Sequence, residues 1–175
     1  MSFTTLLFNS SKILNSRICG EDDPHLTYTT CTIPNRTSRQ TTSLQGSPAR
    51  SKAIIDWTRH TFEIHGRKRD IEQLHSKRGT FSSSRYWSWF AADEYRVKWA
   101  AEMENTWTVY SYDGSVLATF TPKIRRMFHD NVMPVLKLSP SVVDEDEGEF
   151  IMLILLYSET KRREKRPLFV FRRRR

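Results

Sequence analysis

Cysteine, glycine and proline are scarce in this chain, and each scarcity limits what the protein can be. The 175 residues include only 2 Cys, 6 Gly and 7 Pro. So few glycines exclude a collagen-like repeat, and a hydrophobic content of 38% argues against a mostly disordered chain. Cys19 and Cys31 form no CxxC motif, so we expect both to be reduced and incidental to the structure. The length suits one domain with its own core.

Long apolar segments are also missing. The longest run without a polar side chain covers residues 150–157, far short of the roughly 20 residues that a membrane span needs. The first 14 residues lack the basic stretch and apolar core of a secretory signal. We therefore expect no transmembrane segment and a cytoplasmic or nuclear location, with peripheral membrane attachment as a further option.

The sequence contains none of the common catalytic motifs. HExxH, GxSxG, the P-loop and GxGxxG are all absent, and the five histidines lack zinc-site spacing. The acidic run at residues 144–149 resembles a calcium loop, but Leu155 stands where the bidentate glutamate is required. We expect that run to be a solvated linker that also complements a helix start. The prediction is a non-enzyme without metal or cofactor. The alternative is an enzyme whose site is assembled at a barrel mouth from distant residues.

Aromatic residues are plentiful, with 5 Trp, 6 Tyr and 10 Phe, and they favour strands. Residues 94–100 alternate apolar and charged side chains with a period of two. Asp113-Gly114 is a strong hairpin signal, while residues 45–48 and 66–68 are typical of turns. Aromatic and basic residues at 85–89 could stack on nucleic-acid bases, but we expect them in the core. The predicted strands lie at residues 53–58, 61–65, 84–90, 94–100, 107–112, 116–120 and 135–138, with weaker candidates at 4–8, 25–32 and 34–51. About ten to twelve strands in all indicate a sandwich or barrel.

One C-terminal segment differs from this pattern because it has no polar face. Its eight consecutive apolar residues are Phe150, Ile151, Met152, Leu153, Ile154, Leu155, Leu156 and Tyr157. Acids precede them and bases follow, which matches a helix macrodipole and favours a helix at about residues 148–165 over a central strand. A helix that is apolar all round must be enclosed, and burying eight such side chains contributes roughly 12–24 kcal/mol before entropy. Closing the sheet into a barrel would enclose it best.

Many short strands followed by one apolar helix resemble the tubby-like fold of tubby, plant LURP-one-related and phospholipid scramblase proteins. The chain is more similar still to a fungal tubby-like domain family of unknown function. The residues that carry this resemblance are 95–99, Trp107, 115–120, 134–138 and 149–159. It implies a mainly β fold, a closed antiparallel barrel of about twelve strands around a buried C-terminal helix, in one domain at residues 1–166. Tubby binds phosphoinositides through basic residues, but no matching motif occurs here. Residues 167–175 extend past the helix that usually closes the domain.

The net charge of +8 is concentrated at the C-terminus. From residue 161 onward there are nine bases and one acid, a net charge of +8, while the other 19 bases are balanced by 19 acids. The nine candidate anion-binding residues are Lys161, Arg162, Arg163, Lys165, Arg166, Arg172, Arg173, Arg174 and Arg175. Near an anionic membrane each contributes about 1 kcal/mol. We predict a binding or adaptor module that attaches weakly to anionic phospholipid. Nucleic-acid binding or nuclear import through the same tail is the alternative, and a merely solubilising tail is the simplest interpretation.

Overall fold

The computed structural model describes residues 2–34, 39–47, 52–78, 84–89, 93–100, 105–123, 132–142 and 144–165. In these ranges the chain forms thirteen strands and two helices. The strands are β1 (Thr4–Phe8), β2 (Ser16–Gly20), β3 (Thr27–Pro34), β4 (Arg39–Ser47), β5 (Lys52–Asp56), β6 (Thr61–Ile64), β7 (Arg67–Asp70), β8 (His75–Ser76), β9 (Arg85–Trp87), β10 (Tyr95–Ala100), β11 (Thr106–Tyr110), β12 (Val116–Thr121) and β13 (Val135–Leu138). The helices are α1 (Ile71–Leu74) and α2 (Glu145–Lys165).

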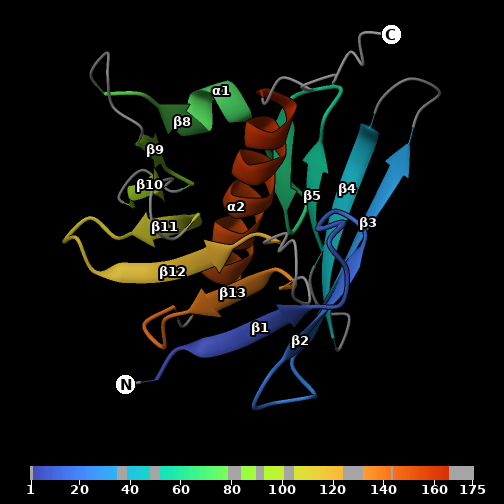
Figure 1. The fold of residues 1–175 in the computed structure, drawn as a ribbon. Helices are drawn as coiled ribbons and strands as arrows, with labels where there is room; N and C mark the ends of the chain where they lie inside the picture. The colour runs from blue at the N-terminus through green and yellow to red at the C-terminus, as the bar shows by residue number, and fades with distance from the viewer. Residues whose placement is uncertain are drawn as a thin grey trace, which may run out of the picture.

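All thirteen strands belong to one antiparallel sheet that is wrapped around α2 (Figure 1). Its order is β7-β6-β5-β4-β3-β2-β1-β13-β12-β11-β10-β9-β8, so nearly every strand lies beside its neighbours in sequence. The exception is the pairing of β1 with β13, which joins the first strand of the chain to the last. This pairing brings the two meanders β1–β7 and β8–β13 together around the helix.

Strand alternation and turn chemistry explain most of these elements. In β10, Tyr95 and Val97 are buried while Arg96 and Lys98 are exposed, as the period of two predicts. The β11–β12 turn lies at Asp113-Gly114, where Gly114 has a φ of +88°. Two predicted turns were wrong in position. Residues 45–47 belong to β4, which pairs along its whole length with β3, and residues 67–68 belong to β7.

The predicted C-terminal helix is confirmed as α2, and it begins three residues earlier than expected. Its 21 residues extend about 31 Å. Asp144 begins it by accepting a hydrogen bond from the backbone N–H of Asp146 at 3.1 Å, as an N-cap does. The acidic run is therefore the first turn of the helix rather than a linker. Residues 150–156 are each at most 4% exposed, and Tyr157 is half-buried.

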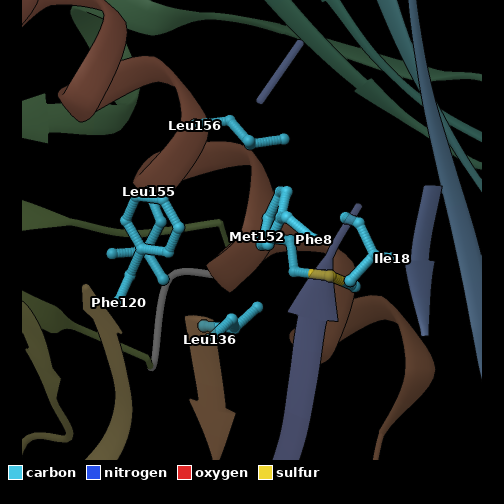
Figure 2. Close-up of a pocket in the computed structure, with 7 residues that line it drawn as sticks. All are labelled: Phe8, Ile18, Phe120, Leu136, Met152, Leu155 and Leu156. Atoms are coloured by element: carbon cyan, nitrogen blue, oxygen red, sulfur yellow. The ribbon is translucent and has the colours of Figure 1, made fainter. Parts of the chain in front are cut away.

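The space between α2 and the sheet is filled by side chains. Figure 2 shows the apolar cavity on one side of the helix, lined by seven residues from α2 and four strands. The lining residues are Phe8, Ile18, Phe120, Leu136, Met152, Leu155 and Leu156. The volume is about 10 Å³, barely one water molecule, and the lining offers no polar partner. This cavity is therefore too small for a ligand.

The expected closure of the sheet into a barrel is not observed among the described residues. β7 and β8 are the two edges of the sheet, and α1 connects them. The N–H of Ile71 donates to the His60 carbonyl, and the Leu74 carbonyl accepts from the N–H of Ser88. The side chains of Ile71 and Leu74 are buried. A short helix thus fills the gap where a closed barrel would need a β7–β8 ladder.

Candidate functional site

A buried carboxylate organises the C-terminal end of α2. Glu159 is fully buried and accepts four hydrogen bonds. They come from Trp107 Nε1 at 3.0 Å, Arg162 Nε and Nη2 at 2.7 and 2.8 Å, and Arg163 Nε at 2.6 Å. Burial alone would raise the pKa of Glu159, but the hydrogen bonds from Arg162, Trp107 and Arg163 outweigh it, so its pKa is lowered. The helix end is thereby fastened to β11 by a charged carboxylate.

Two of the predicted anion-binding arginines are taken up by this carboxylate. The Arg162 guanidinium also lies over the Trp99 ring, 4.1 Å from its centroid, and its side chain is only 17% exposed. Arg163 donates a further hydrogen bond to the Ser11 carbonyl at 3.3 Å. These contacts give both residues a role in the fold that the sequence did not indicate.

A second cluster at the same end keeps its cations accessible. Lys161 Nζ lies 3.3 Å from Glu164 Oε2 and within 6 Å of the rings of Trp57 and Tyr157, which stack on each other. Arg39 in β4 pairs with the same Glu164 and lies over Trp57 at 5.6 Å. The side chains of Arg39 and Lys161 are 41% and 37% exposed.

We call this region the basic end. It comprises Lys12, Arg39, Lys161, Arg162, Arg163 and Lys165, with Glu159 and Glu164. Six cations and two carboxylates give a net charge of +4. Lys12 and Lys165 are exposed, and Lys12 follows the Ser11 that Arg163 contacts. The other predicted anion-binding residues, Arg166 and Arg172 to Arg175, lie outside the described residues, as does the tail at 167–175.

The opposite end of α2 gathers carboxylates that are far apart in the sequence. We call it the acidic end, and it comprises Asp93, Glu94, Asp113, Asp144, Glu145, Asp146 and Glu147, of which Glu94 pairs with Arg78. Four of these residues line an open depression of about 460 Å³. The Tyr95 hydroxyl donates to Glu147 Oε1 at 3.1 Å. Burial is the main reason that the pKa values of Tyr95 and Glu147 are both raised.

The remaining candidate residues, where the structure describes them, show little that resembles a catalytic or metal site. His65 Nε2 lies 2.7 Å from Asp146 Oδ1 and 3.9 Å from the buried Glu149 Oε2, which ties the β6–β7 turn to the helix start. Within the described part of the chain, no three His, Cys, Asp or Glu side chains gather as metal ligands would. Trp87 and Trp89 are core residues, as expected. No helix in the described ranges has the length and apolarity to span a membrane.

The fold and the site define a mainly β protein wrapped around a helix whose two ends carry opposite charge. The chain belongs to a family of unknown function, DUF6593, whose sequence model matches residues 11–164. No curated protein matches it. A protein from Arabidopsis thaliana with an X-ray structure is similar at 11% identity and a TM-score of 0.49, over 91% of this chain and 92% of that one. The resemblance to the tubby-like fold stays a prediction.

Proposed function

We propose that this protein is a non-catalytic binding module that attaches to anionic phospholipid surfaces through its basic C-terminal segment. The observation that carries the proposal is the separation of charge along α2. The basic end has a net charge of +4, and five further arginines follow residue 165. The acidic end lies at the start of the same helix, about 30 Å away.

The strength of this attraction follows from the number of solvent-accessible bases. Each base near an anionic surface contributes about 1 kcal/mol, and the attraction is screened by salt over about 10 Å at 0.1 M. Arg162 and Arg163 are held by Glu159 and contribute less. The tail arginines, Lys161, Lys165 and Arg39 therefore supply most of the attraction. The expected binding is weak, reversible and sensitive to salt.

The packing of the interior supports a surface function rather than an internal ligand site. The cavity beside α2 has a volume of about 10 Å³ and an apolar lining. The buried polar groups Glu159 and Trp107 bond to each other and to neighbouring arginines. A partner that binds at the basic end therefore contacts exposed cations at the surface.

Co-sedimentation with liposomes tests the proposal. The wild-type chain should pellet with vesicles of phosphatidylcholine and phosphatidylserine, and not with phosphatidylcholine alone. Replacing Arg172 to Arg175 by glutamine should weaken binding by at least about a hundredfold, because each lost base is worth about fivefold. The matched control replaces Lys52, Arg67, Lys98 and Lys137, all exposed and outside the basic end, by glutamine.

Two outcomes would contradict the proposal. The first is equal binding by the tail variant and the wild type. The second is an equal loss in the control variant, because any loss of positive charge would then suffice. A parallel titration with duplex DNA separates lipid attachment from nucleic-acid binding. Binding to DNA with a steep salt slope, together with none to vesicles, would favour the nucleic-acid function instead.

A further inference from the structure

Ten neighbouring strands of the sheet contain no carboxylate. In sheet order they run from β4 through β1 and β13 to β8, and none of these described strands has an Asp or Glu. The strands that do contain carboxylates are β5, β6 and β7, which lie together at the other edge. Exposed bases occur on β2, β10 and β13, and they are Arg17, Arg96, Lys98 and Lys137. The outer face of this part of the sheet is therefore positive.

Two tyrosines flank an arginine on the outer face of β9, β10 and β11, which follow one another beside α2 (Figure 1). In the strand register, Arg96 is opposite Tyr86 on one side and Tyr110 on the other. The Arg96 guanidinium lies over the Tyr110 ring, 4.4 Å from its centroid, and that of Arg78 lies over Tyr86 at 4.5 Å. The adjacent Val97 is buried, so this row points away from the core. Rings and guanidinium planes in one row are surfaces on which nucleobases stack.

A second row of polar side chains runs beside the first. It begins at Lys98, two residues after Arg96 on β10, and continues in register through Thr108, Thr119 and Lys137. Thr119 and Lys137 also line an open depression of about 340 Å³. The two lysines stand about 14 Å apart, at three strand spacings. Neither of them pairs with a carboxylate within the part of the chain that the structure describes.

We propose that the outer face of β9–β13 binds single-stranded nucleic acid, with bases stacked on the Tyr86–Arg96–Tyr110 row and phosphates beside Lys98 and Lys137. This function does not depend on the proposed lipid attachment, which uses the basic end. Single strands fit better than a duplex, because their bases are open to stacking. They also fit better than a bilayer, because a flexible strand can follow a sheet that curves around α2, whereas a flat surface touches it only along a line.

The carboxylates beside the tyrosine row determine which side the phosphates take. Glu94, which precedes β10, pairs with Arg78, and Asp113 lies in the β11–β12 turn beyond Tyr110. Both carboxylates belong to the acidic end and repel phosphate. The row that begins at Lys98 lies roughly 7 Å further along the strands from them. Neutral bases therefore suit the tyrosine row, and phosphates suit the lysine row.

Fluorescence anisotropy with the full-length chain and labelled oligo(U) or oligo(dT) of about twelve nucleotides tests the stacking. The double variant Tyr86→Ala, Tyr110→Ala should weaken binding at least about twentyfold, because each lost stack costs about fivefold or more. The double variant Tyr86→Phe, Tyr110→Phe keeps both rings and should bind within about twofold of the wild type. Tyr112→Ala is the matched control, since Tyr112 is 89% exposed at the acidic end, and it should have no effect. The tighter of the two oligonucleotides shows whether RNA or DNA is the ligand.

The salt dependence of binding tests the lysine row independently. The double variant Lys98→Gln, Lys137→Gln should reduce the slope of log affinity against log salt by about 1.4, because each phosphate contact on a single strand contributes about 0.7. A slope equal to that of the wild type would mean that the phosphates do not contact this row, and it would contradict the proposed arrangement.

Three further outcomes would overturn the proposal. The first is equal binding by the wild type and the double alanine variant. The second is competition by poly-glutamate as strong as that by unlabelled oligonucleotide, which would indicate a surface for acidic proteins instead. The third is complete loss of binding when Arg172 to Arg175 are replaced by glutamine, which would place the interaction in the tail. The tyrosine changes do not alter charge and should leave vesicle binding unchanged, so failure here is distinguishable from failure of the lipid function.

Discussion

At the scale of single residues, the buried carboxylate of Glu159 decides which bases are free. A lone ionised glutamate in a core would be strongly unfavourable. Here two guanidinium groups and an indole N–H surround it, so it stays charged and holds the end of α2 against β11. The sequence shows an apolar run that ends at Tyr157, then one glutamate and three bases. Nothing in that local pattern shows that the glutamate points inward, because its partner Trp107 is 52 residues away.

Replacing Glu159 by glutamine tests this arrangement. We expect Glu159→Gln to lower the free energy of unfolding by about 2–4 kcal/mol at pH 7, because two arginines lose their counter-charge beside the core. The measurement is urea unfolding. Glu164→Gln is the control, and it should cost less than about 1 kcal/mol because that pair is exposed. Equal losses in the two variants would show that burial of Glu159 adds nothing.

The same residue sets a pH dependence with a defined sign. The pKa of Glu159 is lower in the folded protein than its ordinary value of 4.5. The contribution of the Glu159 charge to the free energy of unfolding is therefore complete above about pH 4.5. It is lost as the pH falls through the folded-state pKa. The stability difference between wild type and Glu159→Gln should shrink as unfolding is measured at lower pH between about 5 and 3. A difference that stays constant over this range would contradict the assignment.

At the scale of elements, the helix could be predicted and several strands could not. Eight apolar residues between acids and bases left few alternatives to an enclosed helix. β7 escaped prediction because its sequence, Arg67–Asp70, has no apolar residue, and all four residues are exposed at the sheet edge. β4 was predicted only as a weak strand interrupted by a loop, because it is rich in Thr, Ser and Gln and only Thr42 and Leu44 are buried. Pairing with long neighbours, rather than local pattern, makes these segments strands.

The aromatic contacts of α2 predict a large cost for truncation. Phe150 is 1% exposed and packs against Phe62, Trp89 and Tyr95, with ring centroids 5.4 to 6.4 Å apart. We expect Phe150→Ala to lower the free energy of unfolding by about 3–5 kcal/mol. In the same urea titration, Tyr112→Ala should change it by less than about 0.5 kcal/mol. A loss below about 1 kcal/mol for Phe150→Ala would mean that the helix is loosely packed.

Two glycines should respond to alanine in opposite directions. Gly66 has a φ of +77° in the β6–β7 turn, so Gly66→Ala should destabilise by about 1 kcal/mol through backbone strain alone, because no atom lies within 4 Å of the added methyl. Gly148 lies in α2, where the methyl would meet only Val142 Cγ1 at 3.7 Å. Gly148→Ala should stabilise by about 0.5 kcal/mol. Thermal unfolding of both variants checks the signs, and like signs would contradict the assignment.

At the scale of the whole molecule, the sequence predicted the amount of charge but not its arrangement. The excess of bases after residue 161 was visible in the sequence. The neutral remainder, however, contributes Arg39 to the basic end and Asp93, Glu94 and Asp113 to the acidic end. Those residues meet only because antiparallel strands return their loops to the two ends of α2. The opening of the sheet could not be predicted from the sequence either. It lies at α1, whose four residues cannot be distinguished from a turn by their sequence alone.

The fold and the tail should therefore be separable by truncation. A chain ending at residue 165 keeps the α2 core, the Glu159 hydrogen bonds and the Arg39–Glu164 pair, so its unfolding midpoint in urea should match that of the full chain. A chain ending at residue 157 keeps the apolar run but loses Glu159, Arg162 and Arg163, which leaves the Trp107 indole N–H buried without its acceptor. We expect the free energy of unfolding of that shorter chain to fall by several kcal/mol. Its urea unfolding should then show no cooperative transition. If the chain ending at residue 165 were equally destabilised, the last ten residues would be part of the fold, and their arginines could not serve only as an attachment segment.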